Sequence, residues 1–313
     1  MQIYGPVPSR RLGRSLGIAP IPPGTCTYSC IYCQVGRTRH LVADRREFHP
    51  PDAIVAAVED RLAGLKQQHV LVDTLTFLPE GEPTLDAGLG AAVEGVHRTG
   101  IPIAVMTNGS LVDRRSVRAD LSGANWVSVK VDAVDEATWR RINRPHGLLD
   151  LESVLEGLRR FAAEFRGTLV TETMLVAGVN DSADHARRLA AYLGRIAPRR
   201  AYLSVPTRPP AESAIHGPDA ETLTIFERIV RERVRDVELL IGYEGDDFAT
   251  TGDPAEAILA IASVHPMRER AVRSTLERRG VPWHVVEELI EEGRLVRVDH
   301  EGNTYYVRRP AGV

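Results

Sequence analysis

The stretch Cys26-Thr27-Tyr28-Ser29-Cys30-Ile31-Tyr32-Cys33 spaces three cysteines as C-x3-C-x2-C, and the chain has no others. Thiolates so close in sequence can converge on one soft metal centre. Iron–sulfur clusters usually take four thiolates, so a cluster held here would leave one iron without a protein ligand. Catalytic metal centres keep such an open position, whereas structural ones close it. The alternatives are a zinc site completed by a histidine such as His40, or three unrelated thiols.

Strands and helices alternate along most of the chain. Runs rich in β-branched residues predict strands at 15–18, 70–77, 101–106, 126–131, 168–176 and 200–205, with one further short strand at 237–241. Apolar residues at helical spacing predict helices at 51–67, 86–98, 135–142, 150–165 and 219–234, one around Leu111 and Val117, and one that begins after Asp181 or Ser182. Residues 5–20, rich in proline and glycine, predict a shaped loop that contains the short strand 15–18. Arg10, Arg11 and Arg14 in this loop either neutralise a thiolate-bound cluster, bind a substrate anion or form a solvated basic face. The alternation implies an α/β fold with a parallel sheet covered by helices.

Polar residues follow nearly every predicted strand, in one case around a glycine. They are Glu80 and Glu82, on either side of Gly81, after the strand 70–77, then Thr107 and Asn108 after 101–106, Asp132 after 126–131, Asn180 after 168–176 and Arg208 after 200–205. Ligands bind at the carboxyl ends of parallel strands, so these residues and the cysteine stretch predict one shared site.

The fourth and fifth strands carry further candidates. Ser128, Lys130 and Asp132 alternate onto one face, because side chains in a strand have a period of two. A buried lysine has to be paired, and Asp132 is its candidate partner. A purely structural ion pair is the alternative. Glu172 and Met174 share a face of the fifth strand, where they either line the same site or pack into the core.

The cysteine stretch resembles the cluster loop of radical S-adenosylmethionine (radical SAM) enzymes. The run from Gly5 to Thr38 resembles one subgroup of that family, distantly similar to wyosine-base synthases. The resemblance implies that Cys26, Cys30 and Cys33 hold a [4Fe–4S] cluster, and that the amine and carboxylate of SAM chelate its fourth iron. It also implies a partial (β/α)6 TIM-like barrel, which the number of predicted strands fits.

The resemblance also implies contacts to SAM. Tyr32 corresponds to an aromatic residue that packs near the adenine. Gly81-Glu82-Pro83 matches the Gly-Gly-Glu-Pro motif that contacts the methionyl group, whereas Glu80 replaces its first glycine. The remaining residues that we expect in the SAM site are Thr107, Asn108, Ser128, Lys130 and Asp132.

The chemistry implied by the resemblance is radical chemistry. An electron donor such as flavodoxin or ferredoxin would supply one electron through the cluster to SAM, giving methionine and a 5′-deoxyadenosyl radical that abstracts hydrogen from a substrate. With three cysteines, neither a second cluster with cysteine ligands nor a methyl-carrying cysteine can be built. A tRNA-modifying enzyme is one alternative. A non-enzymatic winged-helix regulator whose cluster senses oxygen or iron is another, but it would leave Glu80 to Leu85 unexplained.

The C-terminal part predicts a second domain. The acidic segment Glu244–Pro254 marks a boundary, so we expect a radical SAM core barrel at 1–250 and a small domain at 255–313. Three helices at 255–263, 267–278 and 282–292, followed by a hairpin around 299–303, look like a winged helix. The segment carries nine arginines against nine acidic residues. Protein or substrate docking, nucleic-acid binding and a structural lid remain open as its role.

Composition limits the partners and the compartment. The net charge of -3 gives no overall signal for nucleic acid, and 43% hydrophobic with 26% charged residues describes a soluble globular protein. No apolar run approaches the roughly 18 residues of a membrane span. The first residues lack the apolar stretch of a signal peptide. We therefore expect a cytoplasmic protein with reduced thiols and no membrane partner.

Overall fold

The computed structural model describes residues 1–78, 80–241, 253–264, 266–300 and 302–308. Its main element is an eight-stranded sheet in the order β1-β2-β5-β6-β7-β8-β9-β10. All neighbours from β2 to β10 pair in parallel, and only β1 (Gln2–Ser9) is antiparallel to its neighbour. The parallel strands are β2 (Gly13–Ala19), β5 (Thr74–Phe77), β6 (Ile103–Thr107), β7 (Trp126–Lys130), β8 (Thr168–Met174), β9 (Arg200–Ser204) and β10 (Val237–Leu240). The seven predicted strands are thus confirmed, although β5 begins only at Thr74.

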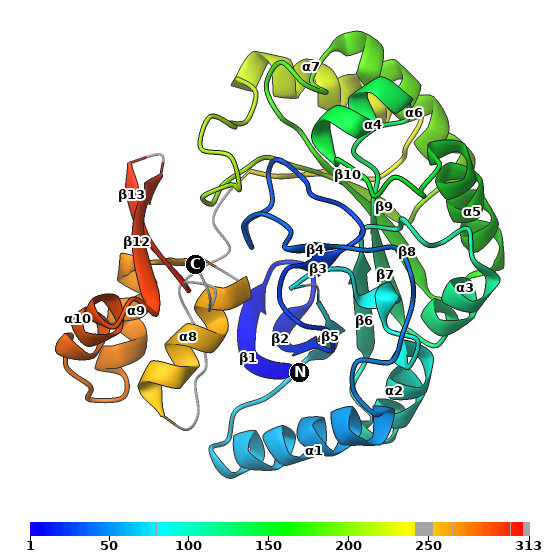
Figure 1. Cartoon of the computed structure of the whole chain (residues 1–313). Coiled ribbons are helices and arrows are strands. Elements are labelled where there is room, and N and C mark those ends of the chain that lie inside the picture. The colour runs from blue at the N-terminus through cyan, green and yellow to red at the C-terminus, as the bar shows by residue number, and fades with distance from the viewer. Residues whose placement is uncertain (79, 242–252, 265, 301, 309–313) are drawn as a thin grey trace.

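Helices cover the outer side of the sheet, which curves around the N-terminal segment (Figure 1). They are α1 (Pro51–Gln67), α2 (Leu89–Val96), α3 (Arg115–Ser122), α4 (Glu136–Ile142), α5 (Leu151–Glu164), α6 (Ala183–Ile196) and α7 (Ala220–Arg231), with short 3-10 helices η1 (Pro83–Leu85) and η2 (His97–Thr99). Ser182 is confirmed as the N-cap of α6, since its side chain accepts a hydrogen bond from His185 N. The helix expected around Leu111 begins later, at Arg115.

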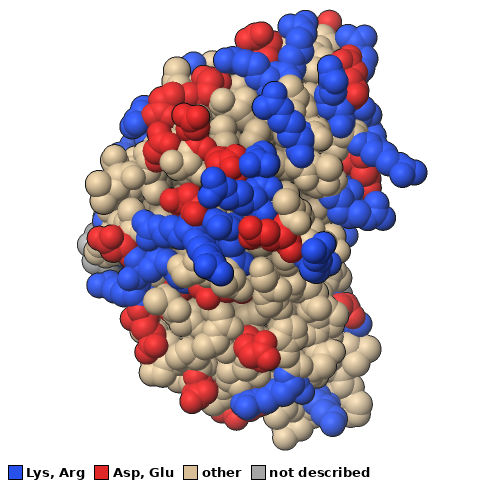
Figure 2. Space-filling model, turned by 90° about the vertical axis from the view of Figure 1, so that its right-hand side faces the viewer, with Lys and Arg blue, Asp and Glu red and all other residues tan. Residues whose placement is uncertain are grey.

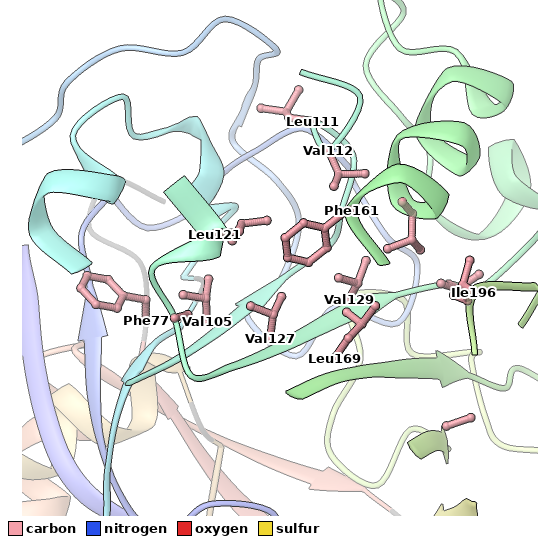
Figure 3. Close-up of a cluster of buried hydrophobic side chains, with 14 of the residues drawn as sticks. Phe77, Val105, Leu111, Val112, Leu121, Val127, Val129, Phe161, Leu169 and Ile196 are labelled. Carbon is pink, nitrogen blue, oxygen red and sulfur yellow. The ribbon is translucent and has the colours of Figure 1, made fainter. Parts of the chain in front are cut away.

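The core lies between the strands and these outer helices. Figure 3 shows Val105, Val127 and Leu169 on the strands pointing towards Leu121 of α3 and Phe161 of α5. Because successive strand residues point to opposite faces, the residues between these apolar ones face the inside of the curved sheet. The polar residues of β7 and β8 are therefore held inside by the apolar packing outside.

The N-terminal segment differs from the prediction of a loop. Residues Gln2–Ser9 form edge strand β1, with an irregular register between Tyr4 and Val7. Prolines are tolerated in edge strands, because one side of such a strand needs no hydrogen-bond donors. Gly17 of β2 makes room for Tyr4, since a β-carbon at Gly17 would lie 2.3 Å from Tyr4 Cζ. The Tyr4 ring therefore occupies the space over Gly17.

The C-terminal unit contains α8 (Pro254–Val264), β11 (Met267–Arg268), α9 (Glu269–Glu277), α10 (His284–Glu291), β12 (Leu295–His300) and β13 (Asn303–Arg308). Its strands form a small antiparallel sheet in the order β11-β13-β12. It lies beside β1 (Figure 1), and its buried apolar residues share a core with Tyr4, Val7 and Ala19. The predicted boundary segment Glu244–Pro254 lies outside the described residues as far as residue 252. None of the helices in the described ranges is long and apolar enough to cross a membrane.

Candidate functional site

A cavity of about 340 Å³ lies inside the curved sheet. Most of the predicted site residues line it: Cys26, Cys33, Tyr32, Gly81, Glu82, Thr107, Asn108, Ser128 and Lys130. Three do not, namely Cys30, Pro83 and Asp132. Glu172, Met174 and Arg208 also line it, as do Arg10 and Arg11. The structure therefore brings the segment 24–39 that carries the three cysteines, called the cysteine loop below, and the strand ends together around one cavity.

The cysteine loop is held by main-chain hydrogen bonds to residues 142–146, at the end of α4 and directly after it. Ser29 N donates to Asn143 O at 2.9 Å, Ile31 N donates to Ile142 O at 3.0 Å, and His146 N donates to Thr27 O at 2.9 Å. From the sequence, Asn143-Arg144-Pro145-His146 is expected to form a plain loop, with an approach to the substrate as the alternative. Its position shows that it fixes the backbone on both sides of Cys30.

N–H groups point at the sulfurs of Cys26 and Cys30. Cys26 Sγ accepts from Tyr28 N and from Asn108 Nδ2, each at 3.5 Å. Cys30 Sγ accepts from Asn143 Nδ2 at 3.5 Å. The main-chain amides of residues 35 and 36 stabilise the thiolate of Cys33. Such donors stabilise the anionic form of a sulfur ligand.

Burial disfavours the ionised form of these thiols, in contrast to the N–H donors. Burial raises the pKa of Cys30 to about 12, assisted by Asp132, and it raises the pKa of Cys26 and of Cys33 as well. The thiols therefore need a cationic partner in order to ionise. Among the described residues, no three His, Cys, Asp or Glu side chains already meet around one metal-ion position. An iron–sulfur cluster binds its thiolates at separate iron atoms, so its three cysteines need not meet around a single metal-ion position.

Gly81 is required by packing against the cysteine loop. A β-carbon at Gly81 would lie 1.7 Å from Thr25 O. The adjacent Glu82 N donates to the same oxygen at 3.0 Å, and Gly24 N donates to Glu80 O at 2.6 Å. The missing β-carbon of Gly81 therefore lets this turn pack on the backbone just before Cys26.

Glu82 joins the ends of β5 and β6. Its buried carboxylate accepts hydrogen bonds from Thr107 Oγ1 at 2.5 Å, Asn108 N at 2.7 Å and Thr84 Oγ1 at 2.6 Å. Burial raises the pKa of Glu82, whereas these donors favour its charged form. The carboxylate thereby fixes the turn that aims Asn108 at Cys26. Pro83 begins the buried helix η1 directly after it.

A network of charges extends from β7 and β8 into the cavity. Lys130 Nζ lies 3.5 Å from Asp132, which confirms the predicted pair, and 3.3 Å from Glu172. Arg11 Nη1 lies 2.5 Å from the other oxygen of Glu172. Burial raises the pKa of Glu172, but Lys130 and Arg11 outweigh it and lower that pKa to about 2. Burial lowers the pKa of Lys130, but Asp132 and Glu172 outweigh this effect, so the pKa is raised.

Asp132 connects this network to the cysteine loop. Its carboxylate accepts hydrogen bonds from the Tyr32 hydroxyl, from Asn143 Nδ2 at 2.7 Å and from Met174 N at 2.8 Å. Lys130 Nζ lies 4.9 Å from the centre of the Tyr32 ring. Tyr32 is therefore held in one orientation at the wall of the cavity.

The other candidates have different surroundings. Arg208 donates to Gln34 of the cysteine loop at 2.8 Å, and Asn180 Nδ2 donates to the carbonyls of Asp132 and Met174. Arg14 pairs with Asp73 in an exposed position, and His40 is exposed. From the sequence, Arg11 is expected to neutralise the cluster, to bind a substrate anion or to lie on a solvated basic face, and the structure pairs it with Glu172. Its pairing with Glu172 and the contact of Asn143 with Cys30 depend on tertiary structure, so no local pattern marks these partners.

Comparison with known proteins agrees with this geometry. The family model of the radical SAM superfamily matches residues 21–190. A UPF0026 protein of Methanocaldococcus jannaschii is 41% identical over 309 residues, covering 97% of this chain and 95% of that protein. The chain belongs to the radical SAM superfamily. The resemblance predicted from the cysteine stretch is thereby confirmed.

Two solved structures share the fold. The structure of TYW1 with a lysine-pyruvate adduct bound has a TM-score of 0.51 at 18% identity, covering 71% of this chain and 74% of that one. SuiB of Streptococcus suis bound to S-adenosylmethionine has a TM-score of 0.52 at 14% identity, covering 73% and 50%. The eight-stranded, mostly parallel sheet is typical of the radical SAM partial barrel.

Proposed function

We propose that this chain is a radical SAM enzyme in which Cys26, Cys30 and Cys33 hold a [4Fe–4S] cluster whose fourth iron binds SAM. The observation that carries the proposal is the set of N–H donors aimed at the sulfurs of Cys26 and Cys30, beside one cavity that Cys26 and Cys33 line. When bound, the two groups supply one-electron cleavage of the sulfonium to methionine and a 5′-deoxyadenosyl radical, which takes hydrogen from the substrate.

The residues around this cavity would have three roles: contact with SAM, positioning of the contacting groups, and exclusion of water. Tyr32, Gly81, Ser128 and Lys130 line it and would contact SAM, and so would the polar groups of Thr107 and Asn108. Glu82, Pro83 and Asp132 would position those groups rather than bind directly, since hydrogen bonds within the protein occupy both carboxylates. Apolar wall residues such as Val7, Leu78 and Leu240 would keep water away from reactive species.

We further propose a partial (β/α)6 barrel at 1–250 with a winged-helix-like domain at 255–313. The C-terminal helices and the β12–β13 hairpin support the second assignment. An acidic electron donor such as flavodoxin or ferredoxin would meet the exposed Arg37 and Arg39 on the cysteine loop. Opposite charge on two surfaces accelerates such encounters.

The outer face shown in Figure 2 does not favour nucleic acid as the substrate. On the face that lies to the right in Figure 1, Lys and Arg are interleaved with Asp and Glu (Figure 2). On α5, for example, Arg159 and Arg160 both pair with Glu156. A nucleic-acid interface usually presents a basic stripe instead. RNA modification therefore remains a less supported alternative to a small-molecule or protein substrate.

The proposal is tested by purifying the protein without oxygen, reconstituting it with iron and sulfide, and adding SAM and a strong reductant. SAM binding is measured first, because cleavage is slow in many such enzymes without substrate. We expect 5′-deoxyadenosine by mass spectrometry from the native protein and none from Cys30→Ala. A four-iron cluster that neither binds nor cleaves SAM would contradict the enzyme and favour a sensor.

A further inference from the structure

Glu80, which stands where the resembled motif has a glycine, links the cavity to the C-terminal unit. The residue is 1% exposed, and its carboxylate accepts a hydrogen bond from Ser263 Oγ of α8 at 2.5 Å. A buried carboxylate is unfavourable unless donors satisfy it, so this contact fixes the side chain. Ala260 O of the same helix lies 2.7 Å from Ser263 Oγ and competes with Glu80 for its single proton.

The main chain of Glu80 is bound on its other side to the cysteine loop. Glu80 O accepts from Gly24 N, and the next two residues pack on Thr25 through the Gly81 approach and the Glu82 amide. Thr25 directly precedes Cys26. One residue therefore connects α8 to the two segments that would hold SAM and the cluster.

The C-terminal unit can act as a firm support. Ile258, Leu259 and Ile261 of α8 are at most 1% exposed and share a core with Tyr4 and Val7 of β1. A second connection is the hydrogen bond from the Tyr305 hydroxyl to Thr207 O at 2.9 Å.

The residues that line the cavity show on which side of the cavity wall the C-terminal unit lies. Tyr4, Glu80 and Thr207 line the cavity, whereas the described residues of the C-terminal unit do not. The described part of the unit therefore contacts the outer side of this wall and does not face the cavity.

We propose that the C-terminal unit positions the SAM-binding loop, with Ser263 acting through Glu80 to hold residues 80–82 against Thr25. This role rests on the proposed function, because it concerns the same SAM site. Glu80 is a positioning residue here, since its carboxylate is directed at α8. Removing the Ser263 hydroxyl leaves a buried carboxylate without this donor, and the loop then shifts to reach water or another partner.

The test uses the full-length protein, reconstituted without oxygen. It measures the Kd of SAM by equilibrium dialysis and the EPR spectrum of the reduced cluster with and without SAM. Ser263→Ala and Glu80→Ala are each expected to raise the SAM Kd about tenfold, as for the loss of one hydrogen bond to a charged group. The double variant is expected to bind no more weakly than the weaker single variant, because both remove the same contact.

Two further variants separate positioning from general destabilisation. Glu80→Gln keeps an acceptor for Ser263 and is expected to stay within about threefold of the native Kd. Thr275→Val in α9 removes a hydroxyl that bonds, within the described part of the chain, to Ala271 O of its own helix at 2.8 Å, and this variant is expected to bind SAM normally. The SAM-induced change in the EPR spectrum should be altered in both alanine variants and unchanged in Thr275→Val.

Each outcome decides between the two proposals. Native SAM affinity in both alanine variants would overturn the positioning role and leave the enzyme proposal intact. An equal loss in Thr275→Val would also overturn it, since the effect would then reflect stability alone. If the native protein with its cluster fails to bind SAM, the proposed function is wrong and there is no SAM loop to position.

Discussion

Gly81 is the residue at which the site tolerates the least change. Gly81→Ala would place a β-carbon 1.7 Å from Thr25 O, so the two segments have to separate. We expect the free energy of unfolding to fall by about 1–3 kcal/mol. We also expect less iron to be bound per chain after reconstitution. Gly147→Ala is the matched control, because a β-carbon there meets no heavy atom within 4 Å. A Gly81→Ala protein with native stability and iron content would contradict the packing argument.

Glu172 makes stability depend on pH. Its folded pKa of about 2 lies below the roughly 4.3 of an unfolded glutamate, because Lys130 and Arg11 outweigh its burial. A lowered pKa contributes stability that is present above the unfolded pKa and is lost as the pH falls through the folded one. We therefore expect Glu172→Gln to lower the free energy of unfolding by about 3 kcal/mol near neutral pH.

Urea denaturation over a range of pH checks this expectation. The difference between native and Glu172→Gln proteins should shrink as the pH falls from about 4.3 towards about 2. Glu59→Gln, which breaks an exposed pair with Arg98, should change stability by less than about 1 kcal/mol. A gap between native and Glu172→Gln proteins that stays constant with pH would exclude the ionic origin.

Much of the candidate site could be predicted because its chemistry is concentrated in short motifs. The cysteine spacing and the polar residues after each strand are visible locally, and the Lys130–Asp132 pair follows from the strand period. Asn143 could not be found in this way, since it is 113 residues away in sequence from Cys30, whose sulfur it contacts. The link between Glu80 and Ser263 likewise requires the packed C-terminal unit.

At the level of elements, prediction succeeded where apolar residues have a clear period and failed at β1. Gly5, Pro6 and Pro8 look like loop residues, yet β1 is an edge strand with an irregular register. An edge strand needs donors on one side only, so proline is less disruptive there than in a central strand. The residues of β1 also pack against α8, more than 240 positions later, which no local window contains.

The pairing of β1 with β2 leads to a prediction about α8. Gly17→Ala would place a β-carbon 2.3 Å from Tyr4 Cζ and displace the ring from the core that it shares with α8. Backbone amides of α8 should then exchange hydrogen about tenfold faster or more, as expected when a local unit opens more easily. Gly64→Ala in α1 has no heavy atom within 4 Å of the new β-carbon and should leave α8 unchanged. Unaltered exchange in Gly17→Ala would show that Tyr4 does not support α8.

At the scale of the whole molecule, β1 joins two hydrophobic cores. Ile3 packs against the core of the main sheet, whereas Tyr4 and Val7 belong to the core of the C-terminal unit. Because residues of β1 pack into both cores, a loss of packing in one core displaces β1 and weakens the other core. The two units should therefore unfold together, although the sequence divides them into two domains.

Calorimetry tests this cooperativity. We expect one transition whose calorimetric and van't Hoff enthalpies agree, the mark of a two-state process. Ile258→Ala, which removes a fully buried side chain of α8, should lower the free energy of that single transition by about 2–5 kcal/mol. Hydrogen exchange should then rise in β5 and β6 as well as in α8, because β2 connects β1 to them through the sheet. Two separate transitions, with only one shifted by Ile258→Ala, would instead show that the C-terminal unit is an independent module attached to the barrel.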